Sequence, residues 1–187
     1  LIIISDDFSK QLSTWQINQN KISVIENWGN LDQIRFNKKK NYEFLKENNL
    51  DIDKFTIMYT GTLALKHDPD LIIKIANSNL DLQIIIIGIG SGYQVLKNKL
   101  DLPKNIKILN LQPFDKMNMV LSSTDIFLAM LNNDAGKYSV PSKILNYLCA
   151  GKPIILSAPK DNLASKIIRE SNSGSVFNPD NFDELIN

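Results

Sequence analysis

The chain has 187 residues, with 21 lysines and arginines and 20 aspartates and glutamates, so its formal net charge is +1. This balance excludes a strongly basic nucleic-acid groove and a polybasic membrane patch, and no nucleic-acid partner is expected. The single cysteine excludes an intramolecular disulfide and indicates a reducing compartment, while the single histidine leaves no ligand set for zinc, so no metal is expected.

The first fifty residues predict short elements ahead of the main domain. Residues 1–5 have the apolar run of a buried strand, residues 6–12 predict a short helix or turn, and residues 21–25 predict another strand. Residues 38–50 have the pattern of an amphipathic helix, and a linker is expected within residues 26–37. Because the chain begins without a methionine, we expect it to be a segment of a longer protein.

A regular alternation of apolar strands and helices begins at Phe55. Near-continuous apolar strands, such as the four isoleucines at 84–87, are typical of parallel sheets, because helices cover both faces of such a sheet. The pattern predicts an α/β domain with a doubly wound, Rossmann-like sheet of six or seven parallel strands. Ligands of such sheets bind at the carboxyl ends of the strands.

The loop after the first core strand is a candidate phosphate site. Gly61 lets the backbone approach a ligand, and Lys66 with the loop amides can hold a phosphate oxygen. The alternative is an ordinary turn between a strand and a helix, since glycine is common after a buried strand. We expect His67 to be a surface residue rather than a catalytic base.

Two further loops carry weaker signals. The Gly-Ile-Gly-Ser-Gly run at 88–92 is similar to a dinucleotide-binding fingerprint, but Tyr93 stands where its third glycine belongs, and we reject that interpretation. Gly88 is expected either beside a nucleotide or in a purely structural role. Phe114, after an expected strand at 106–109, either flanks a base or packs against the next helix.

The most informative helix is expected to start at Pro141 and to end at Gly151. Proline suits the first turn of a helix, Ser139 or Ser142 can cap that end, and a glycine can take the left-handed conformation that ends it.

The same helix has two faces at 100° per residue. The apolar face comprises Ile144, Leu145, Leu148 and Cys149, and the face expected to be open comprises Lys143, Asn146, Tyr147 and Ala150. Lys143 and Asn146 lie one turn apart near a helix N-terminus, which favours anions. They are a candidate anion site, and the alternative is an ordinary surface helix.

With these motifs in view, nearly the whole chain resembles the C-terminal, donor-binding half of a GT-B fold glycosyltransferase of the retaining group called glycosyltransferase family 4. The resemblance rests on Val-Pro-Ser-Lys at 140–143 paired with Ala-Gly-Lys-Pro at 150–153, and on Tyr-Thr-Gly-Thr-Leu at 59–63. It is strongest toward bacterial capsule, O-antigen and colanic-acid enzymes. It implies that residues 1–30 are the end of an N-terminal domain and the crossing between the two domains. Residues 31–187 would then be the C-terminal domain that binds a nucleotide sugar.

The resemblance also implies roles for individual residues. Lys66 and Lys143 would be catalytic and would neutralise the diphosphate leaving group without a metal. Many members of the family have a glutamate that holds the ribose where this chain has Asn146, so the identity of the donor stays open. The residues that it assigns to donor binding are Gly61, Thr62, Gly88, Phe114, Val140, Pro141, Ser142 and Asn146.

The activity implied is transfer of a hexose-type sugar from a UDP- or GDP-sugar to a glycan or lipid-linked acceptor in surface polysaccharide synthesis. The donor is a substrate, and no separate cofactor is expected. The reaction would take place in the cytoplasm or at the inner face of the membrane, and it would need the missing N-terminal acceptor domain as a partner, so this segment alone would be inactive. The alternative is a non-catalytic nucleotide-binding or interaction module with the same fold.

Overall fold

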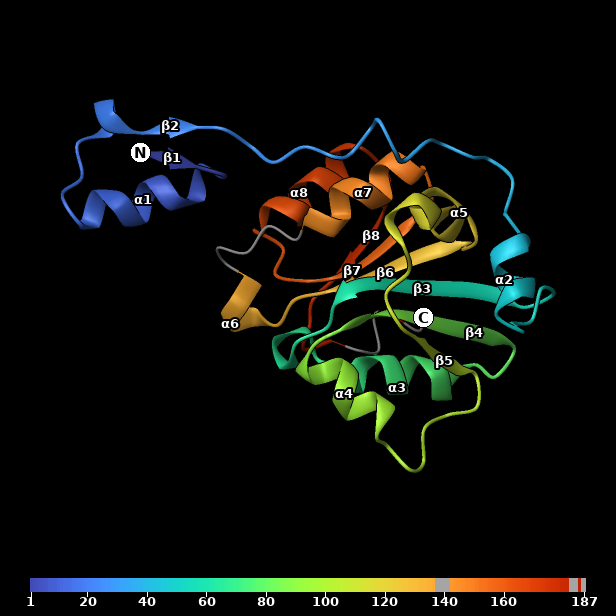
Figure 1. Ribbon diagram of the computed structural model, residues 1–187. Helices are drawn as coiled ribbons and strands as arrows, with labels where there is room; N and C mark the ends of the chain where they lie inside the picture. Colours follow the sequence, from blue (N-terminus) through green and yellow to red (C-terminus); the bar gives the residue numbers. More distant parts are fainter. Residues whose placement is uncertain (137–141, 182–184, 186–187) are drawn as a thin grey trace.

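The computed structural model describes residues 1–136, 142–181 and 185, and its main body is a six-stranded parallel sheet (Figure 1). This architecture confirms the predicted Rossmann-like sheet. In spatial order the strands are β5 (Ile106–Leu109), β4 (Leu82–Ile89), β3 (Phe55–Thr62), β6 (Ile126–Met130), β7 (Ile154–Ser157) and β8 (Gly174–Phe177).

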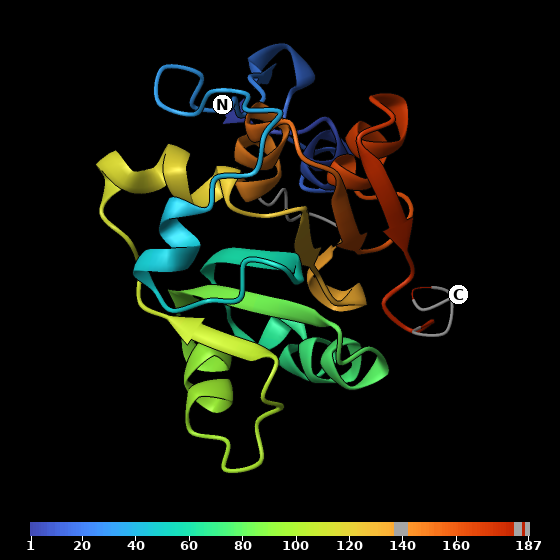
Figure 2. The ribbon, with the colours of Figure 1, turned by 90° about the vertical axis from the view of Figure 1, so that its right-hand side faces the viewer.

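Helices cover both faces of this sheet, as Figures 1 and 2 show from two directions. One face packs against α2 (Glu43–Glu47), α5 (Met117–Ser122), α7 (Ser142–Ala150) and α8 (Leu163–Glu170). The other face packs against α3 (Pro69–Ser78) and α4 (Ser91–Lys97). Because side chains alternate along a strand, Met58 enters the first of these two cores and its neighbours Ile57 and Tyr59 enter the second.

The sheet changes winding direction between β3 and β6. β3 pairs with β4 along its whole length, from Phe55 to Thr62, but its pairing with β6 covers only Ile57 and Met58. Past Met58, the β3 backbone bonds to a side chain instead of to β6. The Thr60 N–H donates a hydrogen bond to the hydroxyl of Tyr147 on α7 at 2.9 Å. The carboxyl ends of β3 and β6 are therefore separated at the switch point, where ligands bind in folds of this kind.

The prediction of which α7 residues are exposed was partly wrong. Tyr147 and Ala150 are buried, and the Tyr147 ring stacks on Phe127 of β6 at 3.9 Å between centroids. Burial raises the pKa of Tyr147 to about 12. The predicted end of the helix is confirmed, since Gly151 has the left-handed φ of 67°.

The N-terminal segment forms a small unit of its own beside the sheet (Figure 1). It contains β1 (Ile2–Ile3), α1 (Asp7–Thr14), the 3₁₀ turn η1 (Gln19–Lys21) and β2 (Ser23–Val24). The helix and the two strands occur where they were predicted, but the strand at residues 1–5 is not buried throughout. Leu1 is 63% and Ile2 68% exposed, because β1 pairs with β2 alone.

An extended strap, residues 26–41, then crosses the outer face of α7 and leads to α2 (Figure 1). It is held by hydrogen bonds from backbone N–H groups, among them Arg35 N–H to the Asn118 side chain at 2.8 Å. The helix expected over residues 38–50 is shorter, because α2 starts only at Glu43, whose backbone N–H donates to the Asn41 side chain at 2.8 Å. The remaining short elements are η2 (Leu65–His67), η3 (Phe114–Lys116) and α6 (Asn133–Gly136).

Candidate functional site

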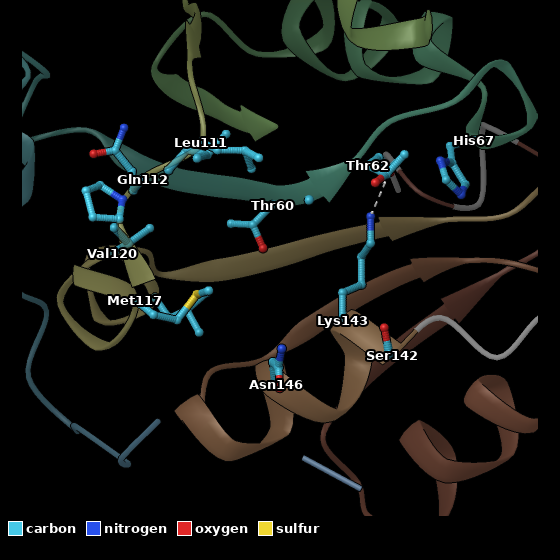
Figure 3. A pocket seen from close by; sticks show the side chains of 14 residues that line it. Thr60, Thr62, His67, Leu111, Gln112, Met117, Val120, Ser142, Lys143 and Asn146 are labelled. Carbon is cyan, nitrogen blue, oxygen red and sulfur yellow. Dashed lines mark hydrogen bonds between the residues drawn. The ribbon is translucent and has the colours of Figure 1, made fainter. Parts of the chain in front are cut away.

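A cavity of about 440 Å³ opens beside the carboxyl end of β3. Its walls come from the end of β3, Ile87 of β4, residues 111–113, α5 and the first turns of α7 (Figure 3). This volume lies within the range of small-molecule sites, and the position is the one at which a doubly wound sheet binds ligands.

Lys143 reaches from the first turn of α7 to the end of β3 at one end of the cavity (Figure 3). Its Nζ donates hydrogen bonds to the Tyr59 hydroxyl and, at 3.3 Å, to the Thr62 carbonyl. Among the described residues no carboxylate forms an ion pair with it. Burial lowers the pKa of Lys143 to about 7, since a desolvated ammonium is disfavoured.

His67 lies at the same end of the cavity, and the prediction that it is a surface residue was wrong. It is 8% exposed, and its Nδ1 accepts a hydrogen bond from the Ala64 backbone N–H at 3.0 Å. A backbone N–H can only donate, so the neutral imidazole carries its proton on Nε2. Burial first, and then the charges of Lys143 and Lys66, lower the pKa of His67 to about 4.

The opposite end of the cavity is mainly apolar. It is lined by Leu111, Pro113, Met117 and Val120, with Gln112 as a polar neighbour (Figure 3). Phe114, the predicted contact for a base, is 56% exposed and is not part of this lining. The stretch just before it, residues 111–113, provides the wall instead.

Two glycines allow β3 and β4 to end close together. A Cβ on Gly88 would lie 2.1 Å from the carbonyl oxygen of Gly61, which only a glycine avoids. Gly61 and Thr62 line the cavity, whereas Gly88 is buried behind them. Gly88 therefore has a structural role that places the two residues in front of it, and its predicted contact with a nucleotide stays a prediction.

Asn146 lies one helical turn after Lys143 and also lines the cavity. Its Oδ1 accepts a long hydrogen bond, 3.5 Å, from the Asn30 backbone N–H in the strap. The amide nitrogen is then the group left for a ligand, so this position offers a hydrogen-bond donor.

The other predicted site residues are placed as follows. Ser142 lines the cavity at the start of α7. Lys66 is exposed and outside the lining, and its backbone carbonyl accepts a hydrogen bond from Asn132 N–H at 3.1 Å. Val140 and Pro141 lie outside the described residues.

Sequence reasoning missed Tyr59 and gave His67 no part in the site. A signal existed for Tyr59, because strand alternation places it on the same side as Gly61 and the predicted phosphate loop. For His67 the sequence holds no equivalent signal, since its burial depends on the turn of η2 back onto β3.

The described residues hold neither a metal-binding cluster nor a membrane-spanning helix. In residues 1–136, 142–181 and 185, no group of three or more histidine, cysteine, aspartate or glutamate side chains is placed to hold a metal ion. Over the same ranges, no helix combines the length and the apolar character needed to cross a membrane.

Comparison with known proteins defines the class. Residues 35–187 match the family described as glycosyl transferases group 1, so the chain belongs to that family. No curated protein sequence matches the chain.

Several solved structures share the fold. Anabaena Alr3699/HepE in complex with UDP is 14% identical with a TM-score of 0.79, and 99% of this chain covers 51% of that one. WaaG, a glycosyltransferase involved in lipopolysaccharide biosynthesis, is 13% identical with a TM-score of 0.76, and 100% of this chain covers 51% of it. Sucrose-phosphate synthase (tll1590) from Thermosynechococcus elongatus is 15% identical with a TM-score of 0.75, and 99% of this chain covers 46% of it. At such identities the likeness shows the fold, and this chain spans about half the length of each structure.

Proposed function

We propose that this chain is the donor-binding part of a retaining, family 4 glycosyltransferase that takes a hexose-type sugar from a UDP- or GDP-sugar. The observation that carries the proposal is the Lys143 ammonium, which faces the cavity without a carboxylate partner among the described residues. A diphosphate supplies the missing negative charge, and the apolar opposite end suits a base. Membership of the glycosyl transferases group 1 family supports this.

In the proposed reaction the bond between the anomeric carbon and the diphosphate oxygen breaks, and its electron pair stays on the diphosphate. The oxygen of an acceptor hydroxyl bonds to the anomeric carbon on the same face, and its proton passes to the departing diphosphate. Lys143 would stabilise the charge that develops on the leaving group. The Nε2–H of His67 and the amide of Asn146 would add uncharged donors.

Further parts of a longer protein would complete the enzyme. Residues 31–187 would be its C-terminal domain, and residues 1–30 the end of an N-terminal domain that binds a glycan or lipid-linked acceptor. HepE was solved with UDP and with UDP-glucose, and WaaG acts in lipopolysaccharide biosynthesis, which supports a nucleotide sugar and a role in bacterial surface polysaccharides. The cytoplasm supplies such donors.

Calorimetric titration of this chain with UDP, GDP and ADP, with and without EDTA, tests the proposal. We expect one diphosphate to bind selectively and EDTA to have no effect. Lys143→Ala should weaken binding about tenfold to a hundredfold, because it removes hydrogen bonds from a charged donor. Lys66→Ala should weaken it less than about threefold, since an exposed charge is screened.

Lys97→Ala is the matched control, because Lys97 is exposed on α4 and outside the cavity lining. Its affinity should equal that of the unchanged chain. If no diphosphate binds, or if Lys143→Ala binds as well as Lys97→Ala, the phosphate site is not where we place it. The non-catalytic interaction module then becomes the better interpretation.

A further inference from the structure

The ammonium of Lys143 is held only by neutral groups among the described residues. Its Nζ lies 3.7 Å from the centroid of the Tyr59 ring, in addition to its hydrogen bonds to the Tyr59 hydroxyl and the Thr62 carbonyl. An aromatic face attracts a cation without cancelling its charge. Lys40 is held differently, by the carboxylate of Asp125 at 2.6 Å, which neutralises it.

The Tyr59 hydroxyl has a fixed direction. It donates to the Thr62 carbonyl at 2.7 Å, so its lone pairs are left to accept from Lys143. The Tyr59 ring is fully buried in the core beneath β3, so packing fixes its position. Burial first, and then the nearby Tyr147, raise the pKa of Tyr59 above its usual value, so the phenol stays neutral.

His67 cannot replace Tyr59 as the partner of Lys143. Its Nδ1 lies 3.3 Å from the Tyr59 hydroxyl, but the Ala64 N–H already occupies this acceptor. The Tyr59 hydroxyl proton goes to the Thr62 carbonyl. Tyr59, Thr62 and His67 therefore all stay neutral around the charged Lys143 ammonium.

We propose that Tyr59 is a positioning residue, which holds the charged end of Lys143 at the cavity wall by its ring and its hydroxyl and leaves that charge free for an anionic ligand. This inference rests on the proposed function, in which the ligand is a nucleoside diphosphate. Tyr59 does not line the cavity itself, so it acts through Lys143.

The protonation of Lys143 depends on the groups around it. The groups around Lys143 that titrate or carry charge are Tyr59 on β3, His67 and Lys66 on η2, and Tyr147 on α7. Tyr59 is the one that accepts a hydrogen bond from the ammonium. Removing this acceptor must therefore lower the pKa of Lys143 further.

The test compares Tyr59→Phe with Tyr93→Phe. Tyr93 is a matched control, because it is also buried, its hydroxyl also donates a hydrogen bond, to Asn110, and Lys97 lies 5.7 Å from its ring centroid, away from the cavity. Both variants are titrated with UDP and GDP from about pH 6 to about pH 9. We expect Tyr59→Phe to bind about tenfold more weakly near neutral pH, with the loss shrinking as the pH falls, and Tyr93→Phe to match the unchanged chain.

The second measurement is carbon–proton correlation NMR of the Lys143 ε-methylene group. It is made without ligand, so it does not depend on diphosphate binding. In the unchanged chain we expect the ε-methylene protons to be shifted upfield by the Tyr59 ring, and the titration midpoint to move to lower pH in Tyr59→Phe. The spectrum of the unchanged chain decides the matter even if the variant fails to fold.

The possible failures are distinguishable. An absent ring shift, or Lys143 titrating alike in both proteins, overturns the role of Tyr59 while the diphosphate site can stand. Absence of diphosphate binding in the unchanged chain overturns the proposed function, whatever the NMR titration shows.

Discussion

The imidazole of His67 is buried with one nitrogen engaged by a backbone donor. Protonation of Nδ1 would break the hydrogen bond from the Ala64 N–H and place a second charge near Lys143. The neutral form is therefore the one that the fold accepts, which agrees with the lowered pKa.

This environment predicts a stability that depends on pH. Between pH 6.5 and about 4, His67 is protonated in the unfolded chain but neutral in the native chain. The free energy of unfolding therefore falls as the pH falls through that window. The decrease due to His67 should be about 3 kcal/mol. His67→Asn keeps an acceptor for the Ala64 N–H and removes the titration, so its unfolding free energy should depend less on pH.

Urea unfolding of both proteins at several pH values in this window gives the comparison. The difference between them isolates His67 from the other groups that titrate in acid. Parallel pH dependences would contradict a buried, neutral imidazole.

For single residues, sequence reasoning predicted Lys143 as a site residue but did not predict its contact with Tyr59. Lys143 was predicted from its place in the first turn of a helix, a local pattern, and it does line the cavity. The contact between Lys143 and Tyr59 joins residues 84 positions apart, and no local pattern encodes it. Lys66 had an equally good local pattern, yet the turn of η2 directs His67 inward and leaves Lys66 exposed.

Among the elements, the strap is fixed to the sheet by a partly buried ion pair. Lys40 donates to Asp125 at 2.6 Å, and the same carboxylate oxygen accepts from the Thr56 N–H at 2.8 Å. The pair therefore joins the end of the strap to the first residues of β3 and to the turn before β6.

Asp125→Ala should lower the free energy of unfolding by roughly 2–4 kcal/mol, because it leaves the Lys40 ammonium and the Thr56 N–H without this partner. Glu47→Ala is the control, since it breaks the exposed pair with Lys116 of similar length, 2.9 Å, and should have little effect. Chemical denaturation of both variants provides the measurement. Equal effects would mean that the burial of the Lys40 pair has no bearing on stability.

The elements themselves were easier to predict than their orientation. Gly151 marked the end of α7 correctly, because a left-handed residue ends a helix wherever it packs. Which side of α7 is buried depends on the sheet beneath it. A tyrosine counted as polar in the helical pattern is buried there, because its hydroxyl finds the Thr60 N–H.

For the molecule as a whole, the N-terminal unit has a two-stranded sheet of its own, separate from the six-stranded sheet of the main body. Among the described residues, the ion pair from Lys166 to Asp7 at 3.9 Å lies between the unit and the main body, and the unit lies to one side in Figure 1. This arrangement agrees with the proposal that these residues belong to a different domain.

Deletion of residues 1–25 should therefore leave the main body folded. We expect the thermal midpoint to change by less than about 4 °C, which corresponds to about 1 kcal/mol for a chain of this size. Circular dichroism melting and size-exclusion chromatography of the shortened chain measure this. A much lower midpoint, or aggregation, would show that the N-terminal unit is part of the same cooperative structure.

The class of fold followed from the sequence because buried parallel strands are apolar throughout, as residues 84–87 are. The order of the strands did not. The pairing of Ile57 with Ile126 leaves no periodic trace, because each strand would be equally apolar in any central position.

The short pairing between β3 and β6 has a consequence for how the chain folds. It divides the sheet into two halves, β3 to β5 and β6 to β8, and each half is built from consecutive parts of the chain. Contacts between distant parts of a chain form slowly, so loop-closure entropy favours completion of each half before the two dock. The cavity lies at the boundary between the two halves, which docks last. A ligand that bridges Lys143 and the end of β3 would therefore stabilise the docked state.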